Sequence, residues 1–119
     1  MKALLIVAHG SRKKESNDEI IRLSAELEKK ARDTFDIVAS AFIQFATPLV
    51  PEVIDQLVAK GVTELIVVPY FIAAGSHVVN DIPRLIDDAR KKYNHIAISL
   101  TPHLGKFDGM KELILSGVR

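Results

Sequence analysis

Apolar and polar positions follow two rhythms that alternate along this chain. Mostly apolar runs occupy residues 3–8, 37–43, 64–71 and 95–100. Between these runs the apolar residues recur every three or four positions, the spacing that places them on one face of a helix. The pattern therefore predicts strands and helices in alternation, with a helix after each strand.

Several residues predict where the helices begin and end. The first helix is expected to open at the stretch SNDE, where Ser16 and Glu19 have the spacing of a capping box. The second is expected to follow Thr47 as its cap, with Pro48 in its first turn, and to end at Gly61. These signals leave short connections between the elements.

Strands that are apolar on both faces, separated by helices, are typical of a parallel sheet covered on both sides. Further helices are expected from about residue 83 and within residues 107–118. Right-handed crossovers then favour a three-layer α/β/α fold, whose four parallel strands lie in the order 2-1-3-4. No repeat or linker divides the sequence, so one domain over residues 1–119 is expected.

This strand order predicts where a ligand would bind. In an open parallel sheet, ligands bind at the carboxyl ends of the strands, where the strand order reverses. Here that point lies between the first and third strands. His9 follows the first strand, His77 lies in the loop after the third, and Gln44 ends the second. We therefore expect these three side chains to share one edge of the sheet.

Two imidazoles in one crevice can bind a divalent transition metal ion or accept protons near neutral pH. His9 and His77 are thus candidate metal ligands and candidate catalytic residues. Each is also compatible with a loop histidine that hydrogen-bonds the backbone. Similarly, Ser11 and Ser76 are compatible with turn or cap residues, and Gly75 with a glycine that the backbone requires.

Composition removes several other chemistries. The chain carries 16 basic and 15 acidic residues, a balance that gives no indication of nucleic-acid binding. Without cysteine it has no thiolate metal site and no thiol catalysis, and it lacks the glycine-rich phosphate motifs and the G-x-S-x-G elbow. Its apolar runs are too short to cross a membrane, so a cytoplasmic location is expected. Three cations at residues 12–14 precede the first helix. They are compatible with a solvated charge run, but the helix dipole disfavours cations at this end, which makes an anionic ligand the alternative.

Four stretches of the chain resemble the small single-domain sirohydrochlorin chelatases, the class II chelatases. They read VAHGSR, AFIQFATP, VVPYFIAAGSHVVNDIP and TPHLG, and they keep the order and spacing of that family. The resemblance implies insertion of Co²⁺, Fe²⁺ or Ni²⁺ into sirohydrochlorin, a tetrapyrrole with carboxylate arms. The metal ion is then a substrate, no cofactor is permanently bound, and His9 and His77 match the metal-site histidines of the family.

The resemblance also implies substrate contacts and a partner. The expected substrate-binding residues are Ser11, Arg12, Gln44, Gly75 and Ser76, with Arg12 able to hold a carboxylate through two hydrogen bonds. One sheet offers one wall to a flat macrocycle, and double-length relatives carry two lobes, so a homodimer is expected. The candidates to cover the face of the macrocycle, or alternatively to form ordinary core, are Phe42, Phe45, Phe71 and Ile72.

One position departs from the family pattern. The family commonly has glutamate where this chain has Gln44. An amide oxygen can contact a cation, but the amide does not take up a proton at neutral pH or neutralise the charge of a metal ion. The alternative function is therefore a non-catalytic protein that binds and carries a tetrapyrrole or a metal ion. A small metal-dependent hydrolase is a third hypothesis, which only the histidines favour.

Overall fold

Four parallel strands form the central sheet of the computed structural model, which describes all 119 residues except the side chain of His77. The strands are β1 (Lys2–Ala8), β2 (Ile37–Phe42), β3 (Glu64–Pro69) and β4 (Ala97–Leu100). Their order is β2-β1-β3-β4 and all neighbours pair in parallel, which confirms the predicted order 2-1-3-4.

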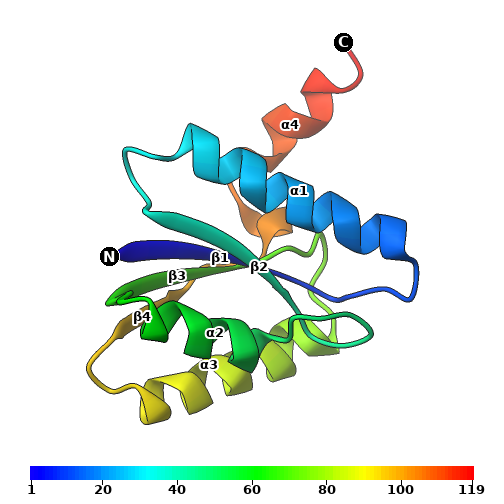
Figure 1. Ribbon diagram of the computed structural model, residues 1–119. Coiled ribbons are helices and arrows are strands. Elements are labelled where there is room, and N and C mark those ends of the chain that lie inside the picture. The colour runs from blue at the N-terminus through cyan, green and yellow to red at the C-terminus, as the bar shows by residue number, and fades with distance from the viewer.

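Helices cover the sheet on both sides, as predicted for a three-layer α/β/α fold (Figure 1). On one side lies α1 (Lys14–Lys30), and on the other lie α2 (Val50–Ala59) and α3 (Ile82–Lys92). A π-helix, η1 (His77–Asp81), leads into α3, and a 3₁₀-helix, η2 (Leu104–Lys106), precedes α4 (Met110–Ser116). Within the described chain, no helix combines the length and the apolarity needed to cross a membrane.

Both predicted helix caps are wrong, whereas the predicted stop is confirmed. The first helix begins at Lys14, so Ser16 lies inside it. The second begins after Leu49, whose backbone N–H donates to Glu52 Oε1 at 3.1 Å, and Thr47 stays in the preceding loop. Gly61 follows the end of α2 with φ of 102°, a conformation that glycine adopts readily.

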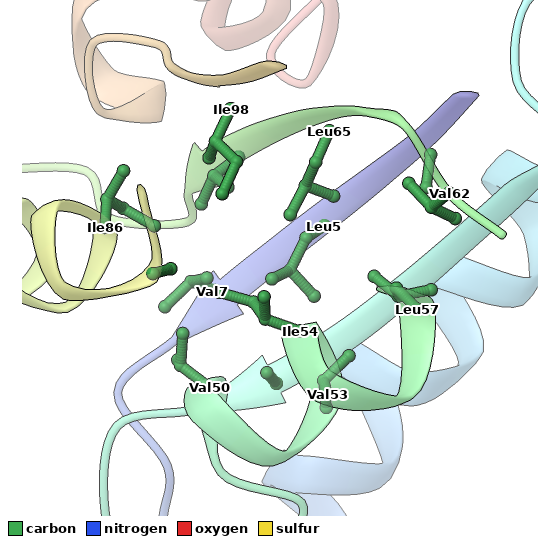
Figure 2. Close-up of a cluster of buried hydrophobic side chains, with 14 of the residues drawn as sticks. Leu5, Val7, Val50, Val53, Ile54, Leu57, Val62, Leu65, Ile86 and Ile98 are labelled. Carbon is green, nitrogen blue, oxygen red and sulfur yellow. The ribbon is translucent and has the colours of Figure 1, made fainter. Parts of the chain in front are cut away.

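The apolar core lies mainly between the sheet and the α2–α3 layer. Side chains from these two helices point toward Leu5 and Val7 of β1 in Figure 2. Leu5, Val7 and Ile86 of α3 are fully buried, and Ile54 of α2 is nearly so. Burial of this kind supplies most of the stabilisation of a domain of this size.

The strand register brings the loops that follow the strands to one edge of the sheet. Ala8, the last residue of β1, lies opposite Phe42 of β2, and Val7 lies opposite Pro69 of β3. The chain segments after β1, β2 and β3 therefore leave the sheet at the same level. This edge is the one at which the sequence predicts a ligand site.

Candidate functional site

His9 comes directly after β1, at the carboxyl edge of the sheet. Its Nδ1 lies 2.9 Å from the carbonyl oxygen of Gly10, which can only accept a hydrogen bond. Its Nε2 lies 2.9 Å from Nε2 of Gln44, an amide nitrogen, which can only donate. Together the two contacts favour the tautomer that carries its proton on Nδ1 and accepts the Gln44 amide N–H at Nε2. A metal ion or a proton at Nε2 would take the place of that amide hydrogen.

Backbone contacts hold Gln44 beside His9. The N–H of Gln44 donates to the carbonyl of His9 at 3.1 Å, and Ile43 N–H donates to Ala8 at 3.0 Å. Gly10 has φ of 95°, and a Cβ added there would lie 1.8 Å from the carbonyl oxygen of Gln44. Only glycine fits so close an approach of the two loops. The predicted meeting of His9 and Gln44 is thus what the structure shows.

Ser11 turns the chain from the site into α1. Its N–H donates to Asn17 Oδ1 at 2.9 Å, Asn17 Nδ2 donates back to its carbonyl at 2.7 Å, and Lys13 N–H donates to its hydroxyl oxygen at 3.0 Å. These bonds explain why α1 begins earlier than the capping-box pattern predicts. They also occupy the Ser11 backbone, so its hydroxyl is the group that remains to donate to a ligand.

Arg12 and Phe45 lie next to His9 and form an open depression with it. The Arg12 guanidinium carbon is 4.7 Å from the centre of the Phe45 ring, within the range of a cation–π interaction. The Phe45 and His9 ring centroids are 5.9 Å apart. The full lining of the depression is His9, Gly10, Ser11, Arg12, Lys13 and Phe45.

The four apolar candidates divide between core and surface. Phe42 is fully buried and Phe71 packs against the core, so both belong to the ordinary core. Phe45 and Ile72 are 52% and 62% exposed. The sequence signal for this division is weak, because Phe42 and Phe45 stand three residues apart in the same motif.

The remaining candidates lie in the loop after β3. Gly75 and Ser76 are exposed there, and the Gly75 carbonyl accepts from Val79 N–H at 3.0 Å. The side chain of His77, the other predicted histidine, lies outside the described residues. Sequence reasoning missed Gly105, which holds this loop: its N–H donates to Phe71 at 3.0 Å, and a Cβ on it would lie 1.6 Å from the Ile72 carbonyl.

Side-chain chemistry at this edge suits an anionic ligand. Arg12 and Lys13 are both exposed beside the depression, whereas Lys14 is paired with Asp18 at 3.0 Å. Among the described side chains, which do not include that of His77, no three of histidine, aspartate and glutamate come together as a metal site. His9 with the Gln44 amide is therefore the described part of any such site.

The model of the CbiX protein family matches residues 3–119 of this chain. This chain belongs to the CbiX family. It is 37% identical over 86 residues to the sirohydrochlorin cobaltochelatase of Methanocaldococcus jannaschii, an alignment that covers 72% of this chain and 59% of that protein. It is 34% identical over 124 residues to the sirohydrochlorin cobaltochelatase of Saccharolobus islandicus, covering 99% and 94%.

Among solved structures, the sirohydrochlorin chelatase SirB from Bacillus subtilis subspecies spizizenii in complex with cobalt has the same fold. The TM-score is 0.80 at 28% identity, and the match covers 98% of this chain and 49% of that one. This chain thus spans about half the length of SirB and a little over half that of the Methanocaldococcus relative.

Proposed function

We propose that this chain inserts a divalent metal ion into sirohydrochlorin, with Co²⁺ as the first candidate and Fe²⁺ and Ni²⁺ as alternatives. Membership of the CbiX family supports this activity, and so do the names of its relatives, which include cobaltochelatases and a chelatase bound to cobalt. The observation that carries the proposal is the His9 imidazole, whose Nε2 meets Gln44 beside the cationic depression at the carboxyl edge of the sheet.

Metal insertion requires steps that imidazole side chains can assist. Insertion exchanges the protons of two pyrrole N–H groups for one divalent ion, so the ion must shed water and the protons need acceptors. A neutral imidazole can donate its lone pair to the ion or take up a proton. In this proposal His9 and His77 share these two roles.

The carboxylate arms of the substrate would bind around the histidines. Arg12 can hold one arm through two parallel hydrogen bonds. The Ser11 hydroxyl, the Gln44 amide and the backbone N–H groups near Gly75 and Ser76 supply further donors. Arg12, Gly75 and Ser76 are exposed and Ser11 and Gln44 are half-buried in loops at one sheet edge. This supports the role, because a large anionic ligand needs an open, donor-rich surface.

Turnover is the experiment that tests the proposal. The purified chain is mixed with excess sirohydrochlorin and Co²⁺, Fe²⁺ or Ni²⁺ in parallel, and the spectral change of metallation is followed after subtraction of the protein-free rate. A chelatase metallates many equivalents of substrate per protein. A carrier, the alternative that the Gln44 amide favours, binds one equivalent and leaves the rate at background.

His9→Ala tests the histidine directly. Removing a group that binds the ion or accepts a proton should lower turnover by at least about 100-fold. Unfolding stability should change by less than about 0.5 kcal/mol, because His9 lies in a loop at the sheet edge. Full turnover in His9→Ala would remove this residue from the mechanism.

Gln44→Glu tests the departure from the family. The two side chains have nearly the same size, so the substitution chiefly adds a carboxylate beside His9 Nε2. That charge should attract the divalent ion and provide a second proton acceptor, raising both Co²⁺ affinity and turnover. Unchanged affinity and turnover would mean that the amide is not standing in for a ligand.

We further propose that two copies of the chain form the working unit. The match to half of the SirB chain supports this, because two copies would equal its length. So does the sheet: β4 buries Ile98 against the α2–α3 layer but leaves Ala97 and Ser99 exposed on its other face. A second copy would cover that face and give the macrocycle its second wall.

A further inference from the structure

Phe45 occupies a backbone conformation that a phenylalanine rarely adopts. Its φ is 63°, in the left-handed region, and it is the only residue other than glycine with a positive φ in the described chain. Such a conformation costs free energy and persists only where the surrounding structure imposes it. Here the loop is fixed at both ends: Gln44 is bonded to His9, and Phe42 N–H donates to the Pro48 carbonyl at 2.9 Å.

The ring gains little burial in return for this conformation. Phe45 is 52% exposed, whereas Phe42, three residues earlier, is fully buried. Glycine or asparagine would adopt the same φ at lower cost and without exposing an aromatic ring. Folding alone therefore does not account for phenylalanine at this position.

The neighbours of the ring point to a ligand. Phe45 lies between the His9 imidazole, 5.9 Å away between centroids, and the Arg12 guanidinium, 4.7 Å from the ring centre. Stacking on the ring limits the rotamers of Arg12, so less conformational entropy is lost when Arg12 binds a carboxylate. An exposed aromatic face, a restrained guanidinium and an imidazole thus line one depression.

We propose that Phe45 is a substrate-binding residue of this site: its ring contacts the flat face of the tetrapyrrole and holds Arg12 toward a carboxylate arm. This inference rests on the proposed function, because it takes sirohydrochlorin as the ligand. It assigns an apolar contact and an orienting role to a residue that neither metal binding nor proton transfer requires. The strained loop fixes the ring at a set position relative to His9.

Matched substitutions separate binding from folding. Phe45→Leu removes the aromatic face, and Phe35→Leu is its control, because Phe35 precedes β2 at the opposite edge of the sheet and also has a cation, Lys2, 5.3 Å from its ring centre. The probe is metal-free sirohydrochlorin, whose binding is followed by fluorescence, and KM and kcat are measured with Co²⁺. Phe45→Leu should raise Kd and KM by about tenfold, the size expected for a lost aromatic contact, with kcat little changed.

The remaining arms test the strain and the coupling to Arg12. Phe45→Gly should unfold at a denaturant concentration no lower than the wild type, yet bind sirohydrochlorin as weakly as Phe45→Leu. Phe35→Leu should lower the unfolding midpoint and leave Kd unchanged. Arg12→Lys should weaken binding in the wild type but add little in Phe45→Leu, because the two side chains act together.

The outcomes distinguish the two proposals. Wild-type protein that neither binds nor metallates sirohydrochlorin refutes the proposed function, and this inference with it. Wild-type protein that does both, while Phe45→Leu and Phe45→Gly match it in Kd and KM, refutes the Phe45 role alone. An additive effect of Arg12→Lys and Phe45→Leu overturns the orienting role.

Discussion

The two faces of the central sheet are built very differently. Among the side chains that the structure describes, the face toward α2 and α3 holds a cluster of sixteen buried residues, whereas the face toward α1 holds a cluster of three: Ile6, Val38 and Val68. Leu5 and Ile6 are neighbours on β1, and they belong to different clusters because successive side chains of a strand point to opposite faces. The same strands therefore contribute to one thick layer and one thin layer.

The difference arises from the connections. Right-handed crossovers place α2 and α3 on one side and α1 alone on the other, over β1 and β2 (Figure 1). The helix that could cover the rest of the thin face, α4, extends away from the body and buries none of its residues. One face of the sheet is thus completed within the chain, and the other is left partly open.

The largest effect should come from a matched pair on β1. Leu5 is 0% and Ile6 4% exposed. Leucine and isoleucine are isomers, so changing either one to alanine removes a similar buried volume. Leu5→Ala should lower the free energy of unfolding by about 4 kcal/mol and Ile6→Ala by about 2 kcal/mol, since the thinner layer can collapse onto the smaller residue. Denaturant unfolding measures both. Equal losses would mean that the two layers are equally well packed.

A smaller, pH-dependent effect should come from a link between α2 and α3. The Tyr93 hydroxyl donates to Asp55, and Lys92 Nζ lies 3.1 Å from the same carboxylate oxygen. The Tyr93 hydrogen bond first, and then Lys92, lower the pKa of Asp55 below its ordinary 3.8. The bond to Asp55 raises the pKa of Tyr93 above 10.0 and that of Lys92 above 10.5.

The directions of these pKa shifts define the pH range in which the link between α2 and α3 stabilises the fold. The contribution of Asp55 is complete above about pH 4 and is lost as pH falls through its lowered pKa. Those of Tyr93 and Lys92 are complete below about pH 10 and are lost as pH rises through their raised pKa values. Asp55→Asn should therefore reduce stability at pH 7 and flatten both limbs of the stability curve, measured by thermal unfolding. Asp87 pairs with Arg90 within α3, so Asp87→Asn is the control.

The layer arrangement could be predicted from the sequence because it depends on local patterns. Apolar runs set the strands, helical spacing set the helices, and the handedness of crossovers then set the order of the strands. The helix starts could not be predicted in the same way. The backbone bonds of Ser11 to Asn17 and of Leu49 to Glu52 decide them, and Ser16 and Thr47 offered equally good local signals.

The site was predictable as far as strand ends determine it. His9 and Gln44 end or follow adjacent strands, so the topology alone brings them together, and the 2.9 Å contact agrees. The conformation of Phe45 and the close approach of Gly105 to Ile72 depend on how two loops pack against each other. Such contacts leave no periodic signal, so only the structure reveals them. The roles of His9, His77 and the substrate-binding residues remain predictions.

The smallest change in chain stability, but a large change in assembly, should come from α4. Leu113 and Ile114 are 60% and 58% exposed. Neighbouring apolar side chains exposed to this extent are typical of a patch that another surface covers. We predict that in the proposed dimer they pack against the second copy, on the open face of the sheet beside Ile66, Ala97 and Ser99. Changing both to glutamine keeps good helix formers while removing the apolar contact.

This double variant should leave the unfolding free energy of the single chain within about 0.5 kcal/mol of the wild type, because neither side chain is buried in it. Losing two apolar contacts at an interface should raise the dimer Kd by more than about 100-fold, measured by sedimentation equilibrium. Lys111→Gln, exposed on the same helix, is the control and should leave Kd unchanged. A wild-type chain that sediments as a monomer contradicts the dimer, and a double variant that stays dimeric places the interface away from α4. If the dimer supplies the second wall for the macrocycle, turnover should fall with the dimer fraction as the protein is diluted.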